Sequence, residues 1–214
     1  MKNLTILVLI FMTISCKNKK EKLVESSIQL GESTLTEPEI KEKTDTIKVE
    51  NGLNEVMQES DILFNGKLKR YFTLDEFERV FGKADSIKLM SEEAPCSYIF
   101  ENEDGSKDMD DKYLYKNGSQ FENTKNKVAV DEFRFTENNF ILFKGKKLNS
   151  STDIKELKKT FPNAIKNIGT MDVFGEGNLQ VIELREDENN ISDGHINLFL
   201  KNGKLYYMHW WFPC

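Results

Sequence analysis

Histidine and cysteine are the residue types that most often carry nucleophilic, acid–base or metal chemistry, and this chain has few of them. It contains two histidines and three cysteines: His195, His209, Cys16, Cys96 and Cys214. A zinc site needs several such ligands at close spacing, and no Cys/His cluster in the sequence supplies them. His195 follows Asp193-Gly194 in an expected turn, and His209 lies in an expected strand. The sequence therefore predicts no catalytic residue, no metal site and no cofactor.

An acidic run, "ENEDGSKDMDD" at residues 101–111, has the composition of a calcium-binding loop. The EF-hand pattern requires Asp or Asn at the first, third and fifth places before its glycine. If Gly105 is that glycine, Phe100 occupies the first place and the pattern fails. The run therefore predicts a solvated acidic loop, and adventitious divalent-cation binding at millimolar concentrations stays open.

Cys16 ends the one long apolar run of the chain, and lysines follow it at once. A single Lys before a short apolar segment is typical of a secretory signal peptide, and the segment is too short to span a membrane. With Ser15 before the cysteine, the pattern resembles the lipobox of bacterial lipoproteins, although Thr13 stands where Leu is usual. The resemblance implies cleavage after residue 15 and acylation of Cys16. An ordinary secretory signal with an incidental cysteine is the alternative.

The residues after Cys16 carry a weaker indication of location. Lys17 stands where Asp would favour retention in the inner membrane, and the basic run 17–20 differs from the acidic signals that direct lipoproteins to the cell surface. The resemblance therefore implies an anchor in the outer membrane, facing the periplasm.

Residues 17–60 contain no Phe, Tyr or Trp and are rich in Lys, Glu, Ser and Thr. Such a segment buries too little apolar surface to offset its ordering entropy. We therefore expect a disordered tether over residues 16–60. The net charge of −6 gives no electrostatic basis for binding nucleic acid.

Cys96 and Cys214 are the cysteines left for pairing in an exported chain. Oxidising compartments favour disulfides, so we expect a Cys96–Cys214 bond between the two halves of the folded part. Free thiols are the alternative.

The folded part reads as a tandem repeat. "ILFNGKL" from Ile62 returns as "ILFKGKKL" from Ile141, and the helical patterns from Thr73 and Thr152 follow in register. Thr73 and Glu76 form a capping-box pattern. We expect strands at 97–102 and 179–186, Asn-Gly hairpins at 117–118 and 202–203, closing strands from 127 and 204, and an extra loop at 119–126.

These elements predict an α+β fold in which two units, residues 61–140 and 141–214, each pack a helix on a small antiparallel sheet. The element order and the duplication resemble the β-lactamase inhibitor protein and the SmpA/OmlA lipoproteins of outer-membrane assembly. The resemblance is one of architecture, from about residue 61 to the end, and it implies no activity by itself.

The last hairpin predicts an aromatic surface. If Leu200 faces Leu205 and Phe199 faces Tyr206 across the Asn-Gly turn, one sheet face collects four large residues: Phe199, Tyr206, Met208 and Trp210. Aromatic residues and Met are enriched at protein interfaces, so these residues are candidates for binding a partner. Packing between the two units is the alternative. The sequence thus favours a non-enzymatic lipoprotein that binds an envelope or periplasmic protein, as an inhibitor, immunity or assembly factor; an enzyme or small-ligand receptor is the second reading.

Overall fold

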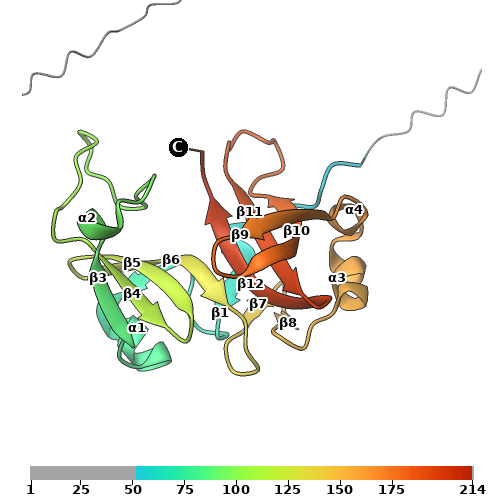
Figure 1. The fold of residues 1–214 in the computed structure, drawn as a ribbon, viewed down its shortest axis with the longest axis horizontal. Coiled ribbons are helices and arrows are strands. Elements are labelled where there is room, and N and C mark those ends of the chain that lie inside the picture. The colour runs from blue at the N-terminus through green and yellow to red at the C-terminus, as the bar shows by residue number, and fades with distance from the viewer. Residues whose placement is uncertain (1–51, 214) are drawn as a thin grey trace, which may run out of the picture. The chain divides into compact units, whose positions relative to one another are not determined.

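A computed structural model describes residues 52–213, which belong to one compact unit. The expected signal peptide, Cys16, Cys214 and most of the expected tether lie outside the described residues. The first described residues run beside α4 (Pro162–Lys166), and the described chain ends with Pro213 (Figure 1).

The predicted α+β fold is wrong, because strands make up 41% of the described residues and helices 17%. A large antiparallel sheet has the order β3 (Ser86–Leu89), β4 (Lys112–Lys116), β5 (Ser119–Thr124), β6 (Lys127–Arg134), β12 (Lys204–Trp211), β11 (His195–Lys201), β10 (Gly177–Arg185) and β9 (Gly169–Val173). A further strand, β2 (Tyr71–Thr73), pairs with β6. A second sheet contains β1 (Ile62–Phe64), β7 (Ile141–Phe143) and β8 (Lys146–Leu148).

The helices are too short to define the fold. They are the 3-10 helix η1 (Glu59–Asp61), α1 (Leu74–Phe81), α2 (Met90–Glu93), α3 (Ile154–Thr160) and α4. At about 1.5 Å per residue, even the eight residues of α1 extend only about 12 Å and cover a small part of a wide sheet. The small sheet contributes further residues to the core beside these helices.

Two local expectations about the first half also fail. Residues 97–102 form no strand, and residues 119–124, expected in a loop, form β5. The Asn117-Gly118 turn therefore joins β4 to β5, whereas Asn202-Gly203 joins β11 to β12. Both turns are confirmed, since both residues of each have positive φ, as a type I′ turn requires.

The order of two strands, a helix (α1 or α3) and four strands occurs twice along the chain, with α2 inserted after β3 in the first half and α4 directly after α3 in the second. The large sheet is symmetric in this order, since β6 and β12 close their respective halves and pair at its centre. The repeated Ile-Leu-Phe segments also pair with each other, with Ile62 opposite Phe143 and Phe64 opposite Ile141. Sheet and core are thus continuous across the two predicted units, and duplication stays our interpretation of this order.

The capping box of α1 is confirmed. The Thr73 hydroxyl accepts from the Glu76 backbone N–H at 3.3 Å, and the Glu76 carboxylate accepts from the Thr73 N–H at 2.8 Å. In the second half, Asp153 caps α3 by accepting from the Glu156 N–H at 2.9 Å. These caps fix where each helix begins, next to the start of β6 and β12 respectively.

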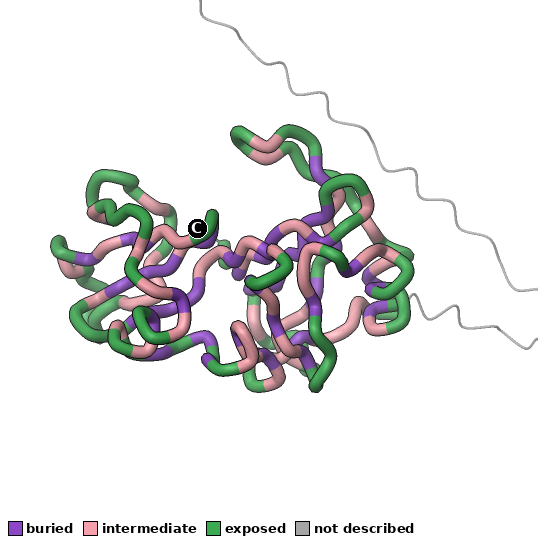
Figure 2. Tube along the Cα trace, turned by 90° about the horizontal axis from the view of Figure 1, so that it is seen from below, coloured by how far each residue is buried: buried purple, intermediate pink, exposed green. Residues whose placement is uncertain are grey.

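One hydrophobic core combines the large sheet, the small sheet and helices α1, α3 and α4. Phe77 of α1 contacts Phe121 of β5 at 5.0 Å between ring centroids, and Phe64 of β1 contacts Phe133 of β6 at 4.9 Å. Figure 2 shows buried stretches alternating with half-buried ones along the strands, with exposed residues gathered in the turns. Helices α1, α3 and α4 and the small sheet therefore pack on one side of the large sheet.

Candidate binding face

The structure separates the four residues predicted to form one aromatic surface. A bulge between Phe199 and Leu200 shifts the hairpin register, so that Phe199 faces Tyr207 and Leu198 faces Met208. Met208 and Trp210 are 0% and 2% exposed and lie in the main core. Phe199 is also buried, on the other side of the sheet, where its ring stacks on Tyr207 at 4.3 Å. The prediction of a shared exposed face is corrected, because one inserted residue turns every later side chain to the opposite side.

The other side of the large sheet carries a different set of residues. We call it the outer face and define it by seven residues of the central strands: Asp131, Glu132, Arg134, Phe199, Tyr207, His209 and Trp211. A second bulge, in β6, pairs Gln120 with Glu132 and Phe121 with Val130, which leaves Asp131 as the extra residue. Asp131 and Glu132 thereby both lie outside the core.

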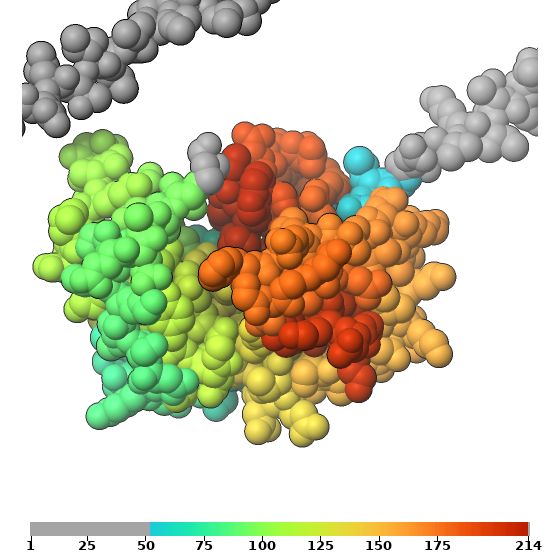
Figure 3. All heavy atoms as spheres, viewed as in Figure 1, coloured from blue at the N-terminus to red at the C-terminus, as the bar shows by residue number. Residues whose placement is uncertain are grey.

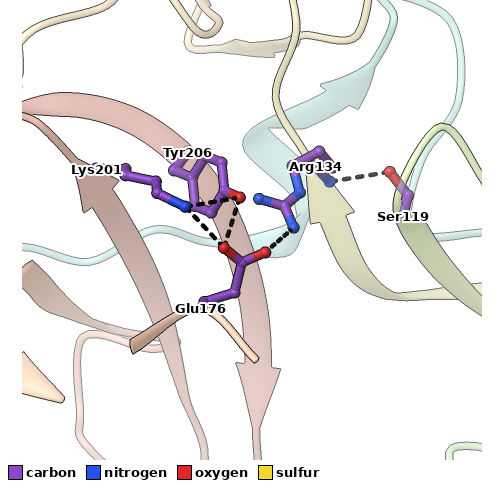
Figure 4. A network of polar contacts seen from close by, with 5 residues as sticks. All are labelled: Ser119, Arg134, Glu176, Lys201 and Tyr206. Carbon is purple, nitrogen blue, oxygen red and sulfur yellow. Dashed lines mark hydrogen bonds and ion pairs between the residues drawn. The ribbon is translucent and has the colours of Figure 1, made fainter. Parts of the chain in front are cut away.

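A polar network ties the two halves together on this face (Figure 4). The Glu176 carboxylate accepts from the Arg134 guanidinium at 2.7 Å, from the Lys201 ammonium at 2.9 Å and from the Tyr206 hydroxyl at 2.7 Å. The Arg134 guanidinium also lies over the Tyr206 ring at 3.8 Å. Hydrogen bonds from Arg134, Lys201 and Tyr206 lower the pKa of Glu176 to about 2. The turn between β9 and β10 is therefore fixed to β6 and β12.

The same turn presents a fully exposed aromatic side chain. Phe174 lies two residues before Glu176 and has no burial at all. Together with Gly118, Glu132, Arg134 and Tyr207 it lines a pocket of about 340 Å³. Figure 3 shows the surface hollowed between the green residues of the first half and the orange turn of β9 and β10.

A cluster of titratable groups occupies the centre of the outer face. Asp131 accepts from the Gln120 side-chain amide at 2.8 Å, and its carboxylate lies 3.8 Å from Nε2 of His209. Burial raises the pKa of Asp131 and lowers that of His209. Burial, with a smaller contribution from Asp131, raises the pKa of Glu132 to about 7. The cluster thus holds acids whose charge the protein environment disfavours.

The loop after α2 is fixed to the edge of this face. Glu122 of β5 is buried, and its carboxylate accepts from the backbone N–H groups of Ile99 at 2.8 Å and Phe100 at 2.7 Å. A pocket of about 190 Å³ lies beneath the loop and is lined by Glu122, Asp131, His209 and Trp211, among others. Trp211 is 37% exposed and stacks on His195 at 4.5 Å.

Cys96 lines that pocket together with Phe212, two residues before Cys214. Cys214 itself lies outside the described residues. The predicted Cys96–Cys214 disulfide therefore stays a prediction, and the closeness of Cys96 to the C-terminal segment supports it.

The described residues give little support to catalytic chemistry. The Asp131 carboxylate lies beside the His209 ring, and no hydroxyl group within residues 52–213 is hydrogen-bonded to that ring. Over the same residues, no three His, Cys, Asp or Glu side chains are grouped to hold a metal ion. Two carboxylates of the acidic run 101–111 accept from its own backbone: Asp104 from the Ser106 N–H at 2.9 Å and Asp108 from the Asp110 N–H at 3.1 Å.

Sequence reasoning missed Asp131, Glu132, Arg134 and Glu176. The alternation in "DEFRF" could have placed Arg134 on the polar side of its strand, opposite Phe133 and Phe135. No local pattern indicates that Glu176, from a turn of the other half, binds it.

Comparison with known proteins identifies no relative: no protein family, no curated protein and no solved structure matches this chain. None of the helices within residues 52–213 is both long and apolar enough to cross a membrane.

Proposed function

We propose that this chain is a lipoprotein of the bacterial envelope, anchored through an acylated Cys16, whose outer face binds a protein partner. The lipobox-like pattern before Cys16 supports the anchor, and Lys17 supports an outer-membrane location facing the periplasm. The partner belongs to the inhibitor, immunity or assembly class of envelope interactions, and the chain needs no cofactor for this role.

One observation carries the binding proposal: Phe174 is fully exposed on a turn that three charge-assisted hydrogen bonds hold in place. A large apolar side chain at a fixed position loses little conformational entropy on binding. Aromatic residues beside Arg are also what the centres of protein interfaces are enriched in. Trp211 adds a second, partly exposed aromatic group to the same face.

The arrangement of the core supports the same face. Helices α1, α3 and α4 and the small sheet pack with the opposite side of the large sheet, in the main core. The outer face has only a small cluster around Leu179, Phe199 and Tyr207. Phe174 and Trp211 are the exposed aromatic residues that a partner would meet there, near the turn of β9 and β10 and the loop after α2 respectively.

Photo-cross-linking in the native organism tests this proposal. A benzophenone side chain is introduced at Phe174 or at Trp211, and at the exposed Glu78 of α1 as a matched control on the helical side. We expect one discrete cross-linked protein from positions 174 and 211 and none from position 78. Equal adducts at all three positions, or none at 174 and 211, would refute an interface on the outer face.

The affinity of the captured partner then gives a quantitative check. A central aromatic residue contributes about 2 kcal/mol or more, so Phe174→Ala should weaken binding about thirtyfold. The melting temperature of the Phe174→Ala variant should stay unchanged, because the Phe174 ring is fully exposed and not part of the hydrophobic core.

A further inference from the structure

A basic surface lies around α3 and α4, away from the outer-face cluster. We define it by seven exposed lysines: Lys144, Lys146, Lys147, Lys155, Lys158, Lys159 and Lys166. Residues 144–166 contain only two acids, Asp153 and Glu156, so the segment carries 7 − 2 = +5 in a chain of net charge −6. Asp153 is already engaged in capping α3. The charge on this surface is therefore opposite in sign to that of the whole chain.

These lysines are largely without anionic partners. Among the described residues Lys144 pairs with Asp61 at 3.5 Å, and the other six form no ion pair. Lys155, Lys158 and Lys159 are three and four residues apart and share one side of α3. Lys144, Lys146 and Lys159 line a hollow of about 540 Å³ between the β7–β8 hairpin and the end of α3, whose other charged residues are Glu55, Arg185 and Glu188. Six lysines are thus available to an external anion.

The chain enters the described unit next to this surface. The Asn163 side chain of α4 donates to the Leu53 carbonyl at 3.2 Å, and Glu55 accepts from the backbone N–H groups of Asn163 and Ala164 at 2.8 and 3.0 Å. The Leu53 side chain is 67% exposed there. Figure 1 shows the first described residues passing α4, beside α3. The segment that leads back to Cys16 therefore leaves from the basic side.

From this placement we propose that the basic surface docks on an anionic lipid bilayer, the one in which Cys16 is anchored. The proposal rests on the lipid anchor of the proposed function. Each lysine near an anionic bilayer is attracted to it, and the attraction falls off within a Debye length. The exposed Leu53 adds an apolar contact at the same place.

Because the anchor keeps the unit near the bilayer, even a weak attraction between the lysines and the lipid is enough for docking. The expected tether places 35 residues between Cys16 and Gly52, and a flexible chain of that length has an rms span of about 30–35 Å, so the lysines would stay close to the bilayer at a high effective concentration. The acidic loop 101–111 lies at the other end of the unit in Figure 1, so docking through the lysines brings no acidic loop near the anionic lipid. Docking through the lysines thus orients the unit with its acidic loop directed away from the lipid.

Vesicle co-sedimentation tests the surface without the anchor. The Cys16→Ser chain, made without residues 1–15, is mixed with vesicles of equal phosphatidylglycerol and phosphatidylcholine, or of phosphatidylcholine alone. We expect binding to the anionic vesicles, at least tenfold weaker binding to the neutral ones, and a loss of binding as salt is raised to several times the physiological level.

Two variants with equal net charge locate the binding surface. Lys155→Gln/Lys158→Gln/Lys159→Gln should weaken anionic-vesicle binding at least tenfold. The matched control, Lys83→Gln/Lys125→Gln/Lys127→Gln, removes three exposed lysines of the first half and should change it less than twofold. Equal losses in both variants, equal binding to both lipids or no binding at all would overturn the proposal. Neither acylation nor a protein partner enters this assay, so its failure is distinct from a failure of the proposed function.

Discussion

Nη2 of Arg134 and Oε1 of Glu176 lie 2.7 Å apart, although the two residues belong to different halves of the chain. Arg134 ends β6, the last strand of the first half, and Glu176 lies in the turn between β9 and β10 of the second half. Their ion pair is only partly exposed, with each side chain 23% accessible. It connects the two halves beyond the pairing of β6 with β12, and it fixes the position of Phe174.

Glu176→Gln should destabilise the protein by about 1–2 kcal/mol at pH 7, because hydrogen bonds to a charged partner are the strong ones. The folded protein lowers the pKa of Glu176 from 4.5 to about 2, so its contribution is complete above pH 4.5 and is lost as the pH falls toward 2. Urea unfolding should therefore show the wild type and the variant converging between pH 4.5 and 2. Glu78→Gln, on exposed α1, is the control, and a pH-independent difference would contradict the assignment.

Glu132→Gln should change the stability in the opposite direction to Glu176→Gln, by stabilising the protein at high pH. Burial raises the pKa of Glu132 from 4.5 to about 7, so the folded state binds the proton more tightly and stability falls as the pH rises from 4.5 to 7. The variant should be more stable than the wild type at pH 8, by about 2 kcal/mol. Urea unfolding at pH 5 and pH 8 measures this, with exposed Glu137→Gln as the control. A variant that is less stable at pH 8 would show that the carboxylate is stabilised instead.

Trp210→Ala should cost about 3–5 kcal/mol of stability, because Trp210 is buried and its ring lies against Phe64 and under the Arg70 guanidinium. Phe174→Ala should leave stability unchanged. Thermal melting of both variants separates the core aromatic residue from the exposed one. A Trp210→Ala melt like that of the wild type would mean that this side chain is not in the core.

Non-reducing peptide mapping should find Cys96 linked to Cys214. The bond would close a loop of 118 residues, counted as 214 − 96, and stabilise the fold by about 4.7 kcal/mol on the chain-entropy view. Reduction should accordingly lower the melting temperature. Two thiols that react with an alkylating reagent in freshly prepared, unreduced protein would rule the bond out.

Cys16→Ser should move the protein from the membrane to the soluble fraction, because two acyl chains hold a protein on a bilayer far more firmly than surface charge. Fractionation at high salt removes the contribution of the basic surface and makes the test specific. Wild-type protein that is soluble at high salt would argue for an ordinary secretory signal.

Local chemistry in the sequence was enough to predict several elements correctly. Asn117-Gly118 and Asn202-Gly203 form the predicted hairpin turns, and Thr73 with Glu76 forms the predicted cap. These features depend on residues a few positions apart, whose dihedral preferences and hydrogen bonds need no distant partner. The same holds for the two Ile-Leu-Phe strands, because the repetition of this segment is a property of the sequence alone.

The tertiary structure decided the strand register, the fold class and therefore the candidate site. The bulge beside Phe199 sends Met208 and Trp210 into the core, and the bulge at Asp131 brings two acids onto the outer face. A strand's side chains alternate with a period of two, so a single inserted residue exchanges the two faces. Whether a bulge forms depends on packing against strands far away in the chain. The contact between Arg134 and Glu176 arises in the same way, since only the pairing of β6 with β12 brings their strands together.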